Sequence, residues 1–172
     1  MYFCNNESCE NVTKEFHEAC IEGYLKKVTI LQRRNEEIDI KQLDKNDTLE
    51  RVVGKGCSEI VKLLLKIGVN VNKKGRFYGA TPFLLACAKG HFLIAKLLLE
   101  NGADMNTIVK HSITAPTSLH FAVKHKNTAI AKLLLENGCK TDVRNQEGFT
   151  AMELAAARGY IDVVKQFAFQ NQ

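Results

Sequence analysis

The nine residues Ile94–Gly102 read Ile-Ala-Lys-Leu-Leu-Leu-Glu-Asn-Gly, and they return as Ile130–Gly138. A looser copy, Ile-Val-Lys-Leu-Leu-Leu-Lys-Ile-Gly, occupies Ile60–Gly68. A segment of small and apolar residues precedes each copy, and its clearest example is Thr81-Pro82-Phe83-Leu84-Leu85-Ala86-Cys87-Ala88-Lys89-Gly90-His91. The recurrence of one unit at a nearly fixed spacing predicts a repeat architecture, in which stacked units bury a continuous core that no single unit could form.

Five copies of the unit share one register. Their equivalent turn positions are 33, 34, 36 and 33 residues apart, and they are Gly23, Gly56, Gly90, Lys126 and Gly159. A threonine such as Thr81 or Thr117 can cap the start of a helix, and Pro82 suits the first helical position. Each copy therefore predicts two short helices, in which alanines beside leucines allow close packing.

The period and the motif resemble the ankyrin repeat family, whose unit contains Thr-Pro-Leu-His-x-Ala-Ala, Gly-His, a leucine-rich helix and Gly-Ala-Asp-x-Asn. Thr81-Pro82 and Gly102–Asn106 match this pattern directly. The resemblance covers about residues 13–169 and implies an all-α solenoid of stacked helix-turn-helix pairs joined by β-hairpin fingers. We expect an N-terminal tail at 1–12 and a single repeat domain at 13–172, with repeats at about 13–41, 42–74, 75–110, 111–144 and 145–172.

Composition limits the possible functions. The chain has 172 residues, of which 45% are hydrophobic and 25% are charged, which is typical of a soluble globular protein. Its apolar runs are shorter than the roughly 18 residues of a membrane span. The net charge of +5 favours acidic partners and is too small to indicate nucleic acid by itself. We expect a monomer in the cytoplasm of its source cell, or of a host cell if it is delivered there.

The residue types that carry chemistry have structural explanations in this register. His17 and His120 fall on the motif histidine, which in the family makes hydrogen bonds between repeats. The chain contains no Cys-x-x-Cys pair, and four cysteines occupy small-residue positions, where we expect reduced, buried thiols: Cys20, Cys57, Cys87 and Cys139. The sequence therefore predicts no catalytic site, no cofactor and no metal site.

The resemblance also implies a binding surface. In the family, three positions of each first helix face a concave groove. Here the groove begins with acidic residues in the first repeat, turns basic afterwards, and has Leu85 and Phe121 as apolar anchors. The groove residues that we expect to contact a partner protein are Arg51, Lys55, Leu85, Lys89, Phe121, Lys124, His125 and Arg158.

Two fingers are longer than the family spacing, and long loops often carry function. The first, around residues 73–78, places an arginine beside Phe77 and Tyr78, and the second runs from 107 to 114. The finger residues that we add to the expected binding set are Lys73, Arg76, Phe77, Tyr78 and Arg144. In the fourth repeat Lys126-Asn127 replaces Gly-His, and we expect mild strain at Asn127, which tolerates a positive φ.

The expected function is a non-enzymatic interaction module, an adaptor or inhibitor whose partner presents an acidic or mixed acidic and apolar surface. Lysine outnumbers arginine 18 to 6, a bias common in AT-rich genomes such as those of some intracellular bacteria and viruses. This bias concerns origin alone, and one form of the expected function is a pathogen or viral protein that engages a host factor. Two alternatives stay open: a nucleic-acid-binding protein and a regulatory subunit of an enzyme complex.

Overall fold

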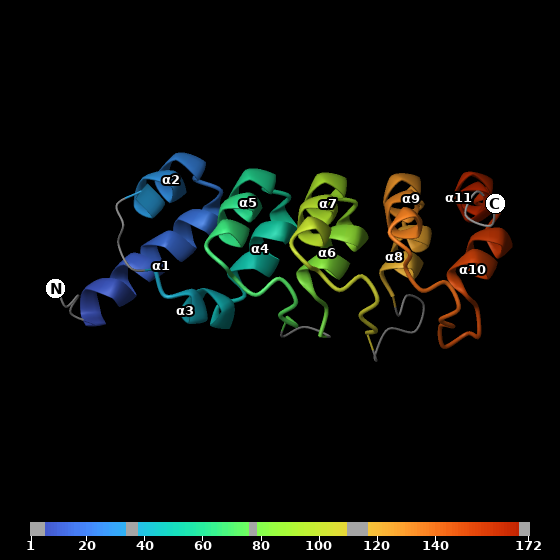
Figure 1. The fold of residues 1–172 in the computed structure, drawn as a ribbon, viewed down its shortest axis with the longest axis horizontal. Coiled ribbons are helices and arrows are strands. Elements are labelled where there is room, and N and C mark those ends of the chain that lie inside the picture. The colour runs from blue at the N-terminus through green and yellow to red at the C-terminus, as the bar shows by residue number, and fades with distance from the viewer. Residues whose placement is uncertain (1–5, 34–37, 76–78, 110–116, 169–172) are drawn as a thin grey trace.

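The protein is a solenoid of helices in the computed structural model, which describes residues 6–33, 38–75, 79–109 and 117–168. Within these ranges, five helix pairs stand side by side along the long axis (Figure 1). The pairs are α1 (Asn6–Glu22) with α2 (Leu25–Arg33), α4 (Thr48–Lys55) with α5 (Ser58–Lys66), α6 (Pro82–Lys89) with α7 (Phe92–Glu100), α8 (Ser118–Lys124) with α9 (Thr128–Glu136), and α10 (Ala151–Ala157) with α11 (Ile161–Ala168). The all-helical fold predicted from the repeats is confirmed.

The second helices form one row, the first helices form another, and the connections lie along the opposite edge (Figure 1). Each first helix packs against its own partner and against the first helices on either side, as α6 does with α7, α4 and α8. Leucines of the second helices and alanines of the first are buried between the rows, among them Leu64, Leu98, Leu134, Ala86 and Ala122. One core therefore runs through every repeat.

Threonine caps start three of the first helices, as the sequence predicts. The side-chain oxygens of Thr81, Thr117 and Thr150 accept hydrogen bonds from the backbone N–H three residues later, at 3.3, 3.4 and 3.2 Å. These bonds satisfy N–H groups that the first turn of a helix leaves without a partner.

The predicted strain in the fourth repeat falls on a different residue. Lys126 has a φ of +53°, whereas Asn127 has a φ of −85° and caps α9 by accepting from the Ile130 N–H at 3.1 Å. The prediction for Asn127 was wrong because Lys126, and not Asn127, occupies the turn position that glycine fills in the other repeats. The ammonium group of Lys126 lies 4.5 Å from the centre of the Tyr160 ring, a favourable cation–π contact.

The N-terminal region is more regular than the sequence predicts. Helix α1 begins at Asn6, so residues 6–12 of the expected N-terminal tail are helical; residues 1–5 lie outside the described residues. Residues 6–16 contain no proline or glycine, and Val12 and Phe16, four positions apart, are half-buried and buried. Both features favour continuation of the helix.

A short helix, α3 (Ile40–Lys45), interrupts the first connection. Asp39 caps it by accepting from the Gln42 N–H at 3.2 Å, Leu43 is buried, and the Thr13 hydroxyl accepts from the Asp39 N–H at 2.9 Å. The expected boundary between residues 41 and 42 therefore lies inside a helix. The repeat pattern does not extend into this segment, so it could not reveal α3.

The connections are joined to one another by side chains. The oxygen of Asn72 accepts from the Asp104 N–H at 2.8 Å, and that of Asn106 accepts from the Lys140 N–H at 2.9 Å. The described part of the connections contains no regular strand. In two connections a backbone hydrogen bond joins the two sides of the turn: Gly75 N–H donates to the Ala80 carbonyl, and Asn145 N–H donates to the Phe149 carbonyl, each at 2.8 Å. These two fingers are hairpin turns, and their described residues form no extended ladder.

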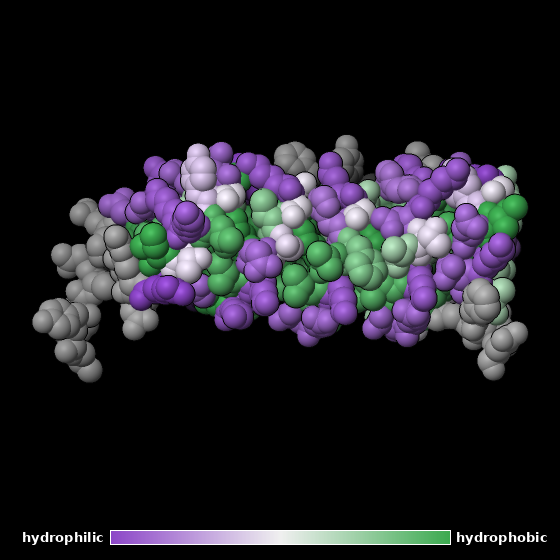
Figure 2. Space-filling view, turned by 90° about the horizontal axis from the view of Figure 1, so that it is seen from above, coloured by the Kyte–Doolittle hydropathy of each residue, from purple (hydrophilic) through white to green (hydrophobic). Residues whose placement is uncertain are grey.

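The outer face of the second helices is mixed. Seen from that side, apolar side chains gather along the length of the molecule between polar margins (Figure 2). Exposed apolar residues of these helices include Ile30, Leu93 and Ile161, and Lys62, Lys96 and Lys132 are exposed there as well. None of the helices in the described ranges combines the length and the apolar character that crossing a membrane requires.

Candidate interaction surface

Four positively charged or titratable side chains occupy the same position on successive first helices. Lys55 and Lys89 are the last residues of α4 and α6, and His125 and Arg158 follow α8 and α10 directly as their C-caps. All four are exposed. We call these four residues the basic row. Positive charge suits this place because the C-terminus of a helix carries partial negative charge.

The side chains of the basic row have no ion-pair partner among the described residues. Within the described ranges, none of the salt bridges or side-chain hydrogen bonds involves its four residues. Leu85 and Phe121 lie one helical turn before Lys89 and His125 and are half-buried, and Lys124 is exposed beside His125. The structure thus places Leu85 and Phe121 one helical turn from members of the basic row, and the expectation that these residues form one binding surface stays a prediction.

Two of the predicted binding residues are instead held by neighbouring carboxylates. The ammonium group of Lys73 pairs with the Asp47 carboxylate and donates to the Asp44 carbonyl. The Arg144 guanidinium donates to the Glu153 carboxylate at 2.9 Å and to the Gly148 carbonyl at 2.6 Å. These contacts fix the connections, so both positive charges are compensated within the chain.

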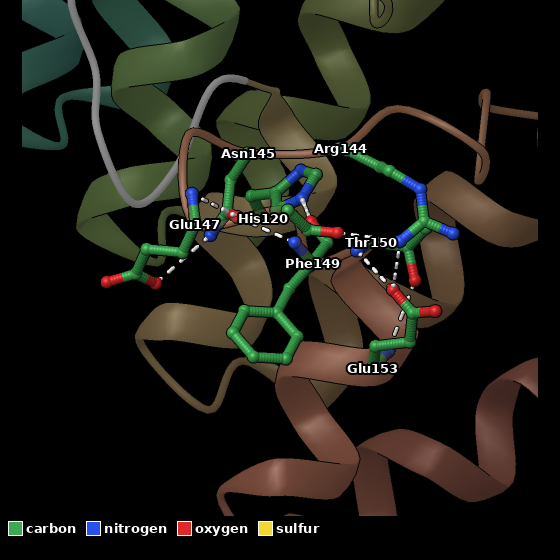
Figure 3. A network of polar contacts seen from close by, with 8 residues as sticks. His120, Arg144, Asn145, Glu147, Phe149, Thr150 and Glu153 are labelled. Carbon is green, nitrogen blue, oxygen red and sulfur yellow. Dashed lines mark hydrogen bonds and ion pairs between the residues drawn. The ribbon is translucent and has the colours of Figure 1, made fainter.

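Figure 3 shows how Arg144 belongs to a network at the start of α10. The side-chain oxygen of Asn145 accepts from the backbone N–H groups of Glu147 and Phe149. Glu153 accepts from the Thr150 N–H at 2.8 Å, which completes a capping box and lowers the pKa of this carboxyl, with Arg144 contributing. These hydrogen bonds within the chain fix the conformation of the last finger.

The remaining finger predictions, Arg76, Phe77 and Tyr78, lie outside the described residues. So does most of the second long finger, including His111. Ile108, at the start of that finger, is exposed.

The sequence predicts acidic residues at the first-repeat end of the groove, but it does not predict the hollow that the structure shows there. It has a volume of about 1070 Å³, and α1, the α3 connection and α4 form its walls. Two cations, Lys14 and Arg51, line it together with five carboxylates: Glu10, Glu18, Asp39, Asp47 and Glu50. We call this cavity the acidic hollow. The start of α1 and the connection that contains α3 form part of its wall, and neither belongs to the repeat pattern, so the pattern could not predict the cavity. The acidic residues of α1 were the sequence feature that indicated its charge.

Two histidines near this surface are structural. The Nδ1 atom of His17 lies 2.7 Å from the Thr48 hydroxyl, and burial, reinforced by Arg51 and opposed by Glu18, lowers the pKa of His17. His120 is buried between the Thr117 hydroxyl at 2.8 Å and the Phe149 carbonyl at 3.2 Å, and burial lowers its pKa as well. Among the described residues no cluster of three or more histidine, cysteine or acidic side chains could hold a metal ion.

The comparisons with known proteins agree with the repeat pattern. A family model described as ankyrin repeats (3 copies) matches residues 16–109 and 107–172. An ankyrin repeat protein of Fowlpox virus (strain NVSL) is 32% identical over 128 residues, which cover 73% of this chain and 37% of the viral protein. An ankyrin repeat and KH domain-containing protein of Caenorhabditis briggsae is 31% identical over 128 residues, which cover 5% of the length of that protein.

A relative of similar size is cyclin-dependent kinase 4 inhibitor B from Bos taurus. It is 32% identical over 117 residues, which cover 68% of this chain and 86% of the inhibitor. The viral and nematode relatives are much longer than the segment they share with this chain. With its repeats, its stacked helix pairs and these matches, the chain belongs to the ankyrin repeat family.

Proposed function

We propose that this chain is a non-enzymatic protein–protein interaction module that binds its partner through the concave groove and the fingers. The observation that carries the proposal is the basic row, whose charges have no ion-pair partner in the described chain and lie beside the half-buried Leu85 and Phe121. Exposed positive charge next to apolar anchors suits a partner with an acidic or mixed acidic and apolar surface.

The relatives support a role as an inhibitor or an adaptor. One is named as a cyclin-dependent kinase inhibitor, and it shares most of its length with this chain. Another is a protein of a virus, which supports a pathogen protein that engages a host factor in the cytoplasm of the host cell. In this proposal the chain acts by binding alone.

The acidic hollow favours a protein partner over nucleic acid. Five carboxylates at the end of the basic row would repel a phosphate backbone that followed the row beyond Lys55. Binding to nucleic acid would show a steep salt dependence, with a slope near −0.9 for each phosphate neutralised, so a filter-binding salt series tests this alternative directly.

A capture experiment tests the proposal. The chain, immobilised, is exposed to a lysate of its source or host cell, and the retained proteins are quantified by mass spectrometry. The test variant is Lys55→Glu/Lys89→Glu/Arg158→Glu, and the matched control is Lys62→Glu/Lys96→Glu/Lys132→Glu, which makes the same change of charge on the second helices. We expect the test variant alone to lose the partner. Equal retention by wild type and test variant would exclude the groove as the interface.

A further inference from the structure

The acidic hollow and the basic row are parts of one continuous surface. Gly54 lines the hollow, and the next residue, Lys55, begins the row. Leu85 lines the hollow as well, and Lys89 follows it one helical turn later on the same face of α6. A segment that lies in the groove therefore meets negative charge at one end and positive charge along the rest.

The negative charge of the hollow is only partly compensated. Asp47 pairs with Lys73, and Asp39 accepts the hydrogen bond that caps α3. The Glu10 and Glu18 side chains are exposed, and neither takes part in a salt bridge within the described residues. With Lys14 and Arg51 as the cations of the lining, carboxylates remain in excess.

Glu50 is the carboxylate of the hollow whose protonation responds to this environment. Burial and the neighbouring Asp47 raise the pKa of the Glu50 carboxyl, and Lys73 opposes them. A positively charged group entering the hollow would stabilise the carboxylate form in the same way as Lys73. A cationic occupant would therefore relieve repulsion that the free protein carries.

We propose that the partner segment has segregated charge: its arginine or lysine side chains enter the acidic hollow, and its acidic side chains lie along the basic row. This inference rests on the proposed function and adds the orientation and the chemistry of the partner. The hollow, at about 1070 Å³, has room for more than one long cationic side chain with its hydration.

The row also indicates a spacing for the acidic residues. Successive repeats stack about 10 Å apart, the usual distance between packed helices. An extended chain advances about 3.3 Å per residue, so every third residue of the segment would reach the next member of the row. The matching ligand is a short basic cluster followed by acidic residues at every third position.

Two synthetic peptides of identical composition test the inference by fluorescence anisotropy. In the segregated peptide, arginines precede a Gly/Ser segment with a glutamate at every third position. A second segregated peptide has the reverse order, because the bound chain can run in either direction along the groove. In the interleaved peptide, the same arginines and glutamates alternate. At about 0.05 M salt we expect one segregated peptide to bind about tenfold more tightly than the interleaved one.

The hollow is then tested with Glu10→Gln/Glu18→Gln, which leaves the capping Asp39 and the paired Asp47 intact. We expect this variant to lose the preference for the segregated peptide, while the matched control Glu59→Gln/Glu100→Gln, with two exposed carboxylates on second helices, keeps it. Equal binding of the peptides to wild type, or an unchanged preference in Glu10→Gln/Glu18→Gln, would overturn the inference. The proposed function has a different test, the capture experiment. It fails if the variant Lys55→Glu/Lys89→Glu/Arg158→Glu retains the partner as wild type does.

Discussion

At the scale of single residues, burial decides how the cysteines react. Cys20 and Cys87 are fully buried in the first helices and Cys139 is buried after α9, and the four cysteines whose side chains are described are free thiols. Burial raises the pKa of Cys20 to about 12 and that of Cys139 to about 11, and it raises the pKa of Cys87 as well. The nucleophilic thiolate is therefore scarce at neutral pH.

We expect slow native labelling of Cys20, Cys87 and Cys139 with N-ethylmaleimide at pH 7.5, and fast labelling after unfolding. Cys57 is half-buried and should react at an intermediate rate, which corrects the sequence-based expectation that it is as protected as the others. Peptide mass spectrometry reads each site separately. Native labelling of Cys20 and Cys87 as fast as in the unfolded chain would contradict their place in the core.

His120 links stability to pH. Its Nε2 donates to the Phe149 carbonyl, and its Nδ1, which accepts from the Thr117 hydroxyl when the ring is neutral, lies 2.8 Å from that hydroxyl. Burial lowers the pKa of His120 and of His17 in the folded state. The unfolded chain therefore binds more protons as the pH falls through about 6.5, and folding loses stability from that pH downward until the folded-state pKa is reached.

The test is the free energy of unfolding in urea at pH 7.5 and pH 5.5. We expect a lower value at pH 5.5 for wild type and a smaller difference for His17→Gln/His120→Gln, whose side chains do not titrate. A wild-type stability that rises on acidification over this range would refute the structural role of these two neutral histidines.

At the scale of elements, two glycines should respond to alanine with opposite signs. Gly54 lies inside α4, and a Cβ there would sit 3.5 Å from Leu85 Cδ2, an ordinary contact; the equivalent residues 88 and 157 are alanines. Gly68 has a φ of +89°, and no atom lies within 4 Å of the position of its Cβ, so only backbone strain acts there.

We expect Gly54→Ala to stabilise the protein by about 0.5–1 kcal/mol, because alanine loses less entropy in a helix. Gly68→Ala should destabilise it by about 1 kcal/mol or more, because alanine avoids this backbone region. Urea denaturation measures both changes. A destabilising Gly54→Ala would show that the groove beside Leu85 lacks the space seen in the structure.

The elements also show what the sequence could predict. Helix pairs were predictable because five copies of one motif averaged out the departures of each copy. Helix α3 and the start of α1 lie outside the motif and depend on local features, namely the Asp39 cap and the pair Val12 and Phe16. Among the predicted site residues, Lys73 is paired with Asp47, 26 positions earlier, and no spacing within one finger reveals such a partner.

At the scale of the whole molecule, stacking makes the proposed interaction surface from residues that are far apart in the sequence. Lys55 and Arg158 are 103 positions apart, yet Lys55 ends the first helix of its repeat, Arg158 directly follows that of its own, and both belong to the basic row. The register of the repeats assigns these residues to one position of the motif, and their role in binding stays a prediction. The hollow beside the row required the two helical segments that the register does not contain.

The central claim is that a partner binds along this row, and the association rate of a captured partner tests it most directly. Surface charges steer association more than they affect folding, so Lys55→Glu/Lys89→Glu/Arg158→Glu should slow association at least about tenfold at about 0.05 M salt with the fold intact by circular dichroism. The control Lys62→Glu/Lys96→Glu/Lys132→Glu should associate within about twofold of wild type. An association rate unchanged by reversing the row, or slowed equally by the control, would contradict the account.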